Sequence, residues 1–281
     1  MNIIDYRFVK DRTEKRNPYA HKGDFGRTLI IAGSYGMAGA AIIASQANIR
    51  SGVGICDIYC QNSIYPILAG NVIEAVYTPY EKPLENIETA LNKADCTVIG
   101  CGMGKNDNTK ALLSFCLQNS KNPLIIDADA LNCLADDVGL LENANCPVIL
   151  TPHIKEMSRL IKTPTEEIIK NRVNISRDFA LKYNVTLVLK GHNTLVTLNN
   201  GEQYVNMSGN AGMATGGSGD MLCGIMGALV CRMSLEDAVC SSVFIHGAAG
   251  DVCACDYSQT STCPTLMLQS LTKIYKKLEQ D

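Results

Sequence analysis

Short apolar runs alternate along the sequence with longer segments of helical character. The short runs are mostly rich in Val or Ile and are bounded by Gly, Pro or Asp, as is typical of strands buried in a parallel sheet. They predict strands at residues 28–32, 54–59, 97–100, 124–127, 148–150 and 185–189. The longer segments predict helices at residues 38–50, 109–119, 155–161 and 165–183. Alternating strands and helices favour an α/β fold, with a mostly parallel sheet and helices on both faces.

The pattern changes in the last third of the chain. Residues 194–198 follow a glycine turn and are typical of a return strand, so we expect a hairpin near the edge of the sheet. Three helices are then expected at residues 219–231, 234–255 and 264–278, separated by a short turn and a polar stretch. No repeat, linker or low-complexity stretch divides the chain. We therefore expect residues 1–281 to form a single domain.

Composition narrows the class of protein. The chain of 281 residues has 46% hydrophobic and 19% charged residues, which is typical of a globular protein. Its formal net charge of −3 argues against a nucleic-acid partner, which usually needs a basic face. No apolar run approaches the roughly 20 residues of a membrane helix, and residues 1–16 lack the core of a signal peptide. We expect a cytoplasmic protein with no membrane partner.

The 13 cysteines are scattered along the chain. Close pairs such as Cys253 and Cys255 lack the repeated two-residue spacing of a zinc site. Others, such as Cys101 and Cys223, lie inside apolar runs. Because a framework of disulfides is typical of small secreted chains, we interpret these residues as free thiols that pack as small buried hydrophobic groups.

A glycine-rich segment at residues 209–220 is the strongest sign of chemistry. It reads Gly-Asn-Ala-Gly-Met-Ala-Thr-Gly-Gly-Ser-Gly-Asp, with five glycines, so the backbone must turn sharply and approach something closely. An apolar helix follows at once. The free amides and the positive dipole at a helix N-terminus form a site for an anion, here the phosphates of a nucleotide.

Two residues at the end of this segment have alternative roles. A carboxylate at Asp220 would repel phosphate, and it is better placed to take a proton from a substrate hydroxyl. The alternative is a plain glycine loop in which Asp220 only caps the helix. Gly219 either presents its amide to phosphate or only permits a left-handed backbone.

Two further glycine-rich segments follow predicted strands. The small residues at 33–41 would let a ligand or a helix lie tightly on the strand end, where open α/β sheets bind ligands. Their spacing does not match the glycines of a dinucleotide-binding turn. Residues 100–105 are no phosphate-binding P-loop either, because the spacing differs and no Ser or Thr follows Lys105.

Polar residues also stand at the ends of two other predicted strands. One of Asp127 and Asp129 can bind Mg²⁺ through water or orient a substrate, although a helix capped by Asp129 is the simpler alternative. Thr151 and Pro152 fit the N-cap and the first position of a helix. Capping then does not require His153, which leaves this residue open to a ligand contact.

Two more segments have both a functional and a structural interpretation. Lys190 precedes a Gly-His-Asn-Thr turn at residues 191–194, which suits a phosphate or ribose but also the polar tip of a hairpin. Residues 21–27, His-Lys-Gly-Asp-Phe-Gly-Arg, stand directly before the first predicted strand, either as part of a site or as a charged loop.

Taken in order, these segments resemble the ribokinase-like superfamily and, more closely, the ADP-dependent NAD(P)H-hydrate dehydratase family. The resemblance spans about residues 19–276. Its most specific motifs lie at residues 22–27, 127–132 and 209–220, and His-Gly-Ala-Ala-Gly-Asp at 246–251 also fits. The chain departs from the family between His153 and Glu156, where Ile-Lys replaces the usual Pro-Gly.

The resemblance implies a fold, a reaction and a set of contacts. The fold would be a ribokinase-like three-layer α/β/α sandwich. The reaction would be the ADP-dependent dehydration of the 6S hydrate of NADH or NADPH, with Asp220 as catalytic base and with Mg²⁺ and backbone donors stabilising the transferring phosphoryl group. The expected hydrate contacts are Ala40, Ala41, Gly102, Gly104, His153 and Asp220. The expected nucleotide contacts are Lys190, Gly191, His192, Asn193, Thr194, Gly217, Ser218 and Gly219.

The resemblance also implies a homotetramer, and we expect no fused epimerase domain. A rival function is a small-molecule kinase of the same superfamily, acting on a thiazole alcohol or a hydroxymethylpyrimidine. It would share the turn at Asp220, but residues 22–27 and 209–215 favour the dehydratase. A nucleotide sensor without turnover would have no use for a base at Asp220. The residues leave open the choice between NADH and NADPH hydrates, and only the resemblance favours ADP over ATP.

Overall fold

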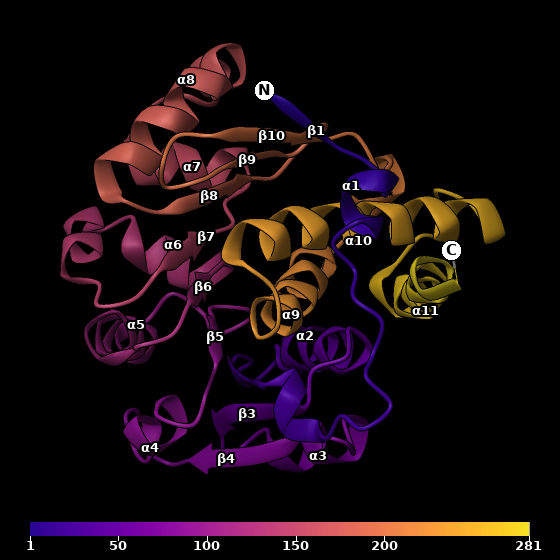
Figure 1. The fold of residues 1–281 in the computed structure, drawn as a ribbon. Helices are drawn as coiled ribbons and strands as arrows, with labels where there is room; N and C mark the ends of the chain where they lie inside the picture. The colour runs from indigo at the N-terminus through magenta and orange to yellow at the C-terminus, as the bar shows by residue number, and fades with distance from the viewer. Residues whose placement is uncertain (281) are drawn as a thin grey trace.

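The computed structural model describes residues 1–280, and a ten-stranded sheet runs through it (Figure 1). The strand order is β1-β10-β9-β8-β7-β6-β5-β2-β3-β4. All neighbouring strands are parallel except the two pairs that involve β9. The strands are β1 (Asn2–Ile4), β2 (Arg27–Ile31), β3 (Ile55–Gln61), β4 (Val76–Tyr80), β5 (Cys96–Ile99), β6 (Leu124–Ile126), β7 (Val148–Leu150), β8 (Thr186–Leu189), β9 (Leu195–Thr197) and β10 (Gln203–Asn206).

Helices cover both faces of the sheet and form a three-layer α/β/α sandwich. One face carries α1 (Tyr6–Lys10), α2 (Ala38–Arg50), α3 (Tyr65–Asn71), α9 (Ser218–Val230), α10 (Leu235–Asp256) and α11 (Pro264–Gln280). The other carries α4 (Ile87–Leu91), α5 (Asp107–Asn119), α6 (Ala128–Leu134), α7 (Ile154–Ile161) and α8 (Thr165–Tyr183). Short 3₁₀ helices occur at η1 (Lys22–Phe25), η2 (Val138–Asn143) and η3 (Ala211–Met213). In Figure 1, α5 and α6 lie to the left of the strands, and α10 and α11 lie to the right.

Side chains alternate along each central strand and fill a core under each helical layer. In β2, Ile30 shares a core with α2, α9 and α10. Its neighbours Leu29 and Ile31 share the opposite core with α4, α5, α6 and α7. Because both faces of the strand are buried, consecutive positions are apolar, which is why these strands appear in the sequence as continuous apolar runs.

The predicted strands and helices all occur, and their ends lie within two residues of the expected bounds. The pattern misses the strands β1, β4 and β10 and the short helices α1, α3, α4 and α6. β1 and β4 are the edges of the sheet, and β4 contains Pro79. β10 places Gln203 and Asn206 at buried positions, where hydrogen bonds from Gln203 Nε2 to Val173 O (2.8 Å) and Thr197 Oγ1 (3.1 Å) satisfy its amide.

α10 corrects the expectation that no segment is long and apolar enough to cross a membrane. Among the described helices it passes that test by length and composition, with 22 residues. Most of its apolar window is buried, and it packs against α9 and α11. A single helix of this kind is also typical of the core of a globular protein, which is how α10 is packed here.

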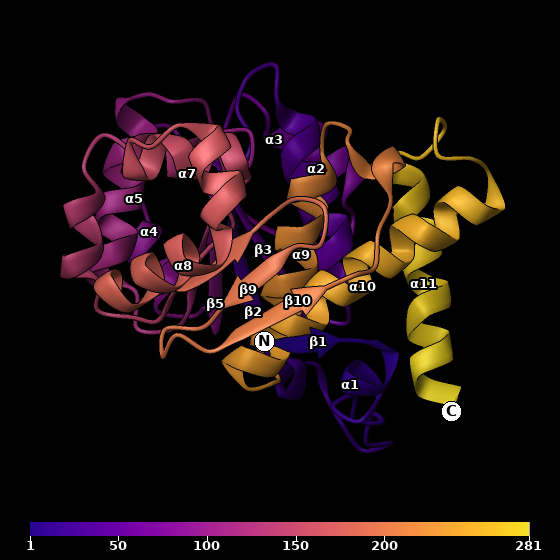
Figure 2. The same ribbon diagram turned by 90° about the horizontal axis from the view of Figure 1, so that it is seen from above.

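The direction in which strands are added reverses between β2 and β5. β3 and β4 follow β2 on one side, whereas β6, β7 and β8 follow β5 on the other. Loops from the carboxyl ends of two such strands diverge and leave a crevice, where open α/β sheets bind ligands. In Figure 2, α3 and α7 mark this end of the sheet at the top of the view, and α1 lies at the bottom.

α2 and α9 touch through small residues below this crevice. A Cβ on Gly224 of α9 would lie 2.0 Å from the Ala44 carbonyl oxygen and 2.9 Å from the Ala47 Cβ. Asn48 Nδ2 donates to the Gly224 carbonyl (3.1 Å) and to Thr28 Oγ1 (3.0 Å). Because α9 begins at the glycine-rich segment, this contact places that segment relative to β2.

We expect Gly224→Ala to lower the free energy of unfolding by about 1–3 kcal/mol, because the backbone of α2 cannot move away from the added methyl group. The matched control is Gly70→Ala on α3, where a Cβ would meet nothing within 4 Å. That control should be neutral or stabilise by up to about 1 kcal/mol. Urea denaturation measures both variants, and equal stabilities would contradict the close contact between α2 and α9.

Candidate active site

The loops that follow β2 and β5 meet across the crevice. Gly33 N donates to the Cys101 carbonyl (2.8 Å), and Ser34 Oγ donates to the Gly102 carbonyl (2.9 Å). A Cβ on Gly102 would lie 2.6 Å from the Ala40 Cβ, and Gly102 has a φ of +62°. Only glycine therefore fits at this position. The two small-residue segments found in the sequence form one continuous surface here.

Four of the expected hydrate contacts belong to these two segments. Ala40, Gly102 and Gly104 are partly exposed. Ala41 is 0% exposed, and its Cβ lies close to Gly33. We therefore keep the first three as proposed contacts and drop Ala41, because it has no exposed atom to offer a ligand.

α6 begins after Asp127, which has the backbone conformation of an N-cap but makes no capping hydrogen bond with its side chain. Asp129 Oδ2 accepts a hydrogen bond from Gly104 N (2.7 Å). The helix occurs, but the alternative in which Asp129 caps it is wrong, because Asp127 is the N-cap and the Asp129 carboxylate instead holds the loop after β5 in place.

The glycine turn leads directly into α9. Gly217 is the N-cap, with a φ of +89°, and a Cβ there would lie 2.7 Å from Ile43 Cδ1. Gly219 lies inside the helix and does not have a positive φ, so the left-handed position is Gly217. A Cβ on Gly219 would lie 3.2 Å from both Asp127 Oδ2 and Lys190 Nζ. The first amides of α9, which lack partners within the helix, therefore stand beside these two charged groups.

Two side chains of α10 hold the glycine-rich segment at both ends. His246 Nε2 lies 3.3 Å from Ser218 Oγ. Asp251 accepts hydrogen bonds from Gly209 N (2.8 Å) and Asn210 Nδ2 (2.9 Å). Burial lowers the pKa of His246 to about 4, so the ring is neutral at neutral pH. The motif on α10 that fits the family thus has a positioning role.

A buried ion pair lies beside the turn. Lys190 Nζ is 2.6 Å from Asp127 Oδ1, and Cys223 Sγ donates to Asp127 Oδ2 (3.3 Å). Burial alone would raise the pKa of Asp127, but the Lys190 ammonium outweighs it and the pKa is lowered. Burial likewise would lower the pKa of Lys190, but Asp127 raises it. Both groups are therefore charged at neutral pH.

Asp220 is half-buried on the first turn of α9. Burial, and then the negative charge of Asp127, raise the pKa of its carboxyl group, while a hydrogen bond with Cys101 and the charge of Lys190 act to lower it. Because Gly217 is the N-cap, the alternative in which Asp220 caps the helix is wrong. A carboxylate with a raised pKa beside helix amides can accept a proton from a ligand hydroxyl.

His153, and not Thr151, is the N-cap of α7. Its Nδ1 accepts hydrogen bonds from Lys155 N (3.0 Å) and Glu156 N (3.1 Å), and the Glu156 carboxylate accepts from His153 N (2.8 Å). The prediction of an N-cap at Thr151 with Pro152 as the first helical residue is wrong, because an imidazole nitrogen takes the role usual for a hydroxyl. His153 and Glu156 therefore cap the helix reciprocally, although Ile-Lys stands between them where the family usually has Pro-Gly.

The segments predicted for hydrate and nucleotide lie side by side. A β-bridge joins His153 to Lys190. Beyond Lys190, a hydrogen bond from Thr194 Oγ1 to Gly191 O (3.1 Å) closes the turn at residues 191–194, whose tip is exposed. The turn is a hairpin tip by geometry, and its contact with a nucleotide stays a prediction.

Cys101 and Cys223 belong to the site, although the sequence indicated only a packing role for their thiols. Cys101 hydrogen-bonds Asp220, and Cys223 hydrogen-bonds Asp127. Both are fully buried, and all described cysteines are free, as expected. The available signals were that Cys101 stands between two glycines of a strand-end loop and that Cys223 follows Asp220 by three residues on one helix face.

Residues 22–27 lie outside this site. They lead into the amino end of β2, whereas the glycine turn stands at the carboxyl ends of the strands. A Cβ on Gly54 would lie 1.7 Å from Lys22 O, and Arg27 forms an ion pair with Asp57 (2.7 Å). The segment packs against the start of β3. It is therefore a structural loop and not a part of the catalytic turn.

The residues present do not form a cage for Mg²⁺. Within residues 1–280, Cys101, Asp127 and Cys223 bring potential metal ligands within 4.8 Å of one another. Thiols suit softer ions, whereas Mg²⁺ prefers oxygen ligands and retains several waters. Both oxygens of Asp127 are already bonded. Mg²⁺ therefore fits this site only as an ion carried by the phosphates of a nucleotide.

Comparison with known proteins identifies the family. The family described as NAD(P)H-hydrate dehydratase matches residues 28–273, which include the glycine-rich segment, Asp127 and Lys190. The chain belongs to this family. The ADP-dependent (S)-NAD(P)H-hydrate dehydratase of Neisseria meningitidis is 36% identical over 241 residues, which cover 83% of this chain and 79% of that protein.

Solved structures share the fold. The ADP/ATP-dependent NAD(P)H-hydrate dehydratase of Bacillus subtilis, co-crystallised with ATP and Mg²⁺, has a TM-score of 0.88 at 26% identity and covers 99% of both chains. A ribokinase-like superfamily protein from Enterococcus faecalis has a TM-score of 0.89 at 27% identity, covering 100% of this chain and 97% of that one. The predicted ribokinase-like fold is confirmed. The chain spans about half the length of several curated relatives that it matches, which are named bifunctional NAD(P)H-hydrate repair enzymes.

We expect Lys190→Met to lower the free energy of unfolding at neutral pH by about 3–5 kcal/mol, because it leaves the Asp127 carboxylate buried without its partner. The double variant Asp127→Asn/Lys190→Met should recover much of that loss, since both charges are removed. Urea titrations of both variants measure the difference, and equal losses would contradict the importance of the pair.

The same pair predicts a pH dependence. The folded state lowers the pKa of Asp127. The contribution of the charged Asp127 to the free energy of unfolding is therefore present above the unfolded-state pKa, and it is lost as the pH falls through the folded-state pKa. The gap in stability between wild type and the double variant should therefore shrink under strongly acidic conditions.

Proposed function

We propose that this chain dehydrates the 6S hydrate of NADH or NADPH with ADP, and releases NAD(P)H, AMP and phosphate. A hydroxyl on the hydrated ring leaves poorly as hydroxide. Transfer of the terminal phosphoryl group of ADP to its oxygen gives a phosphate ester and AMP. The lone pair of the ring nitrogen then expels phosphate, and loss of a proton from the neighbouring ring carbon restores the reduced nicotinamide.

Asp220 is the observation that carries this proposal. It lies on the first turn of a helix whose amides attract phosphate. A carboxylate in that position opposes phosphate binding, so its presence needs another reason. Its raised pKa makes it a stronger base than an ordinary aspartate, suited to the proton that the substrate hydroxyl must lose.

The ligand positions that we propose come from the family resemblance, and the geometry of the site supports them. The hydrate lies on the surface formed by Ala40, Gly102 and Gly104, near His153. The phosphates of ADP lie on the amides of Gly217, Ser218 and Gly219, beside the Lys190 ammonium, and the nucleoside extends along residues 191–194. Mg²⁺, when bound with the nucleotide, supplies charge neutralisation at the phosphates.

Several parts of this proposal rest on relatives. A relative named as ADP-dependent supports ADP as the phosphoryl donor, and a structure co-crystallised with ATP and Mg²⁺ supports a nucleotide with its ion. The preference for ADP over ATP, the homotetramer and the cytoplasmic location stay predictions.

Two rival functions differ in measurable ways. A superfamily kinase would phosphorylate a thiazole alcohol or a hydroxymethylpyrimidine and would not restore NADH. A sensor would bind nucleotide without turnover. Membership of the dehydratase family favours the first proposal over the kinase, and the carboxylate at Asp220 favours it over the sensor.

We expect the wild-type protein to convert NADH hydrate to NADH faster with ADP than with ATP, and not at all without a nucleotide. Asp220→Asn should retain nucleotide affinity and lose about 10²–10⁴-fold in kcat, because the amide keeps the shape and removes the base. The absorbance of NADH and calorimetric titration with ADP measure the two quantities.

Asp256→Asn is the matched control, because this carboxylate pairs with Lys273 at the end of α10 and should leave the rate unchanged. Turnover that needs no nucleotide would overturn the proposed function. A wild-type rate in Asp220→Asn would remove Asp220 as the base while leaving the activity itself established.

A second prediction concerns the acid limb of the rate. Turnover should fall as pH drops through the raised pKa of Asp220, because a protonated carboxyl group cannot accept the proton. The Cys101 hydrogen bond lowers that pKa, so Cys101→Ala should move the acid limb to higher pH. Cys116→Ala on α5, an equally buried thiol, is the control and should leave the limb in place. An unmoved limb in Cys101→Ala would show that this thiol does not tune the base.

A further inference from the structure

Within residues 1–280, one group of three buried residues places potential metal ligands close together. The Sγ atoms of Cys101 and Cys223 and a carboxylate oxygen of Asp127 all lie within 4.8 Å of one another. Cys101 follows β5, Cys223 lies on α9 and Asp127 follows β6, so three elements contribute to the group. β5 and α9 pack against each other in the centre of the molecule (Figure 1). The packing of the core therefore fixes the positions of these ligand atoms.

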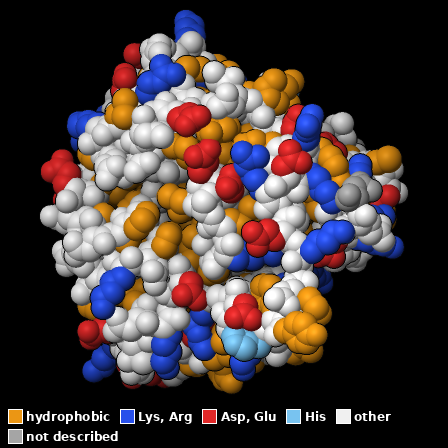
Figure 3. Space-filling view, in the orientation of Figure 1, with side chains coloured by type: hydrophobic (Ala, Val, Ile, Leu, Met, Phe, Trp, Pro, Cys, Tyr) orange, Lys and Arg blue, Asp and Glu red, His pale blue; other side chains and the backbone are white. Residues whose placement is uncertain are grey.

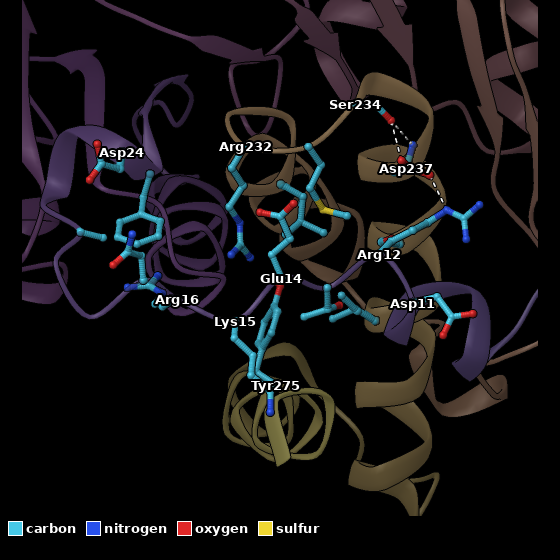
Figure 4. Close-up of a pocket in the computed structure, with 18 of the residues that line it drawn as sticks. Asp11, Arg12, Glu14, Lys15, Arg16, Asp24, Arg232, Ser234, Asp237 and Tyr275 are labelled. Atoms are coloured by element: carbon cyan, nitrogen blue, oxygen red, sulfur yellow. Dashed lines mark hydrogen bonds and ion pairs between the residues drawn. The ribbon is translucent and has the colours of Figure 1, made fainter. Parts of the chain in front are cut away.

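Elsewhere in the described chain, charged side chains of both signs are mixed. A cavity of about 740 Å³ beside residues 11–25 is lined by Arg16 and Arg232 together with Glu14 and Asp24 (Figure 4). Asp and Glu side chains likewise lie among Lys and Arg side chains on the face shown in Figure 3. Neither region favours an ion of one sign, whereas the cysteine group combines ligands that one class of cation prefers.

Hydrogen bonds join this group to the proposed catalytic base. Cys223 Sγ donates to Asp127 Oδ2 (3.3 Å). The thiols of Cys101 and Cys223 hydrogen-bond to each other, and Cys101 also hydrogen-bonds Asp220. The two thiol protons thus hold four side chains together in one network. A cation that replaced both protons would have a ligand atom from each of these side chains within reach.

The spacing suits a small tetrahedral cation. In a tetrahedral zinc site with bonds of about 2.0–2.3 Å, neighbouring ligand atoms are about 3.3–3.8 Å apart. The 3.3 Å between Cys223 Sγ and Asp127 Oδ2 already matches this spacing. The other separations are no larger than 4.8 Å, so small side-chain movements bring them into range. Thiolates favour Zn²⁺ over Mg²⁺, which prefers oxygen ligands alone.

The charge of the buried group also permits the exchange. The hydrogen bond with Cys223, and then burial, raise the pKa of the Cys101 thiol, so it carries its proton in the free protein. A bound divalent cation removes such a proton outright. One Zn²⁺ displaces two thiol protons, which leave to water, so the total charge of the group does not change. The loss of the Cys223 proton also frees Asp127 Oδ2 to become a ligand, while Asp127 Oδ1 keeps its ion pair with Lys190.

We propose that Cys101, Cys223 and Asp127 bind Zn²⁺, and that Asp220 takes the fourth ligand position. Asp220 is half-buried at the crevice, so the cation enters past its carboxylate. A carboxylate that coordinates Zn²⁺ cannot accept a proton from the substrate hydroxyl, so zinc at this position inhibits turnover. The inhibition rests on the proposed function, whereas the binding does not depend on it.

Titration with Cd²⁺ tests the site, because thiolates bound to Cd²⁺ give an ultraviolet charge-transfer band that free thiols lack. The protein is titrated without nucleotide and with a phosphine reductant that keeps the cysteines reduced. We expect the band to saturate at one tightly bound Cd²⁺ per chain. Excess Zn²⁺ should remove the band by taking the same site, whereas excess Mg²⁺ should leave it in place.

Cys101→Ser and Cys223→Ser should each weaken Cd²⁺ binding by more than about 100-fold, because each removes a ligand, and even residues that only support a ligand are worth about 10–100-fold. Cys255→Ser, at an exposed thiol on α10, is the matched control and should keep the wild-type affinity. Wild-type affinity in either of the first two variants would overturn the proposal, as would loss of the band in Cys255→Ser.

A measurement on the wild type decides the matter if a serine variant does not fold. The ¹¹³Cd chemical shift depends on the number of sulfur ligands, and we expect the value for two sulfurs. A shift typical of oxygen ligands alone would overturn the site.

Zn²⁺ should also slow the dehydration of NADH hydrate in proportion to the occupancy of the site. Full occupancy with an unchanged rate would remove Asp220 as the fourth ligand. A wild-type protein without any turnover would overturn the proposed function, and the Cd²⁺ band would still decide whether the cysteines bind the cation.

Discussion

Asp127 and Lys190 can each remain charged in a buried position because the other is beside it. Asp127 directly follows β6 and Lys190 directly follows β8, so their attraction spans β7 and ties together the carboxyl ends of three strands. The same two side chains stand against Gly219 at the start of α9. The helix amides and Asp220 are therefore placed by electrostatic attraction as well as by packing, and the charge of Asp127 also strengthens Asp220 as a base.

The central fold could be predicted from the sequence because its strands are buried on both faces. β2 and β5 to β8 are short apolar runs between Gly, Pro and Asp, and no tertiary information is needed to recognise them. β10 could not be recognised in this way. Gln203 looks like a surface residue in the sequence. Its burial is possible because Val173 O and Thr197 Oγ1 accept from its amide nitrogen and Arg177 donates to its amide oxygen, and two of these partners lie more than 20 residues away. β4 is concealed by Pro79, which an edge strand tolerates.

In the candidate site, the groups that act within one short segment could be predicted, and those that act across the fold could not. The glycine turn and Asp220 are contiguous, so their chemistry is visible in the sequence. Cys223 and Asp127 are 96 residues apart, and no spacing rule connects them. The capping role of His153 was missed for a different reason, because the usual preference for Ser, Thr, Asp or Asn pointed to Thr151.

β1 pairs with β10 at the edge of the sheet, and Asn2 stands opposite Tyr204. A ribosome that adds about 5–20 residues per second takes some tens of seconds to make the intervening chain. Throughout that time residues 2–4 lack the strand with which they pair. Although they are made before the other strands of the sheet, they can join it only after residues 203–206 have been made.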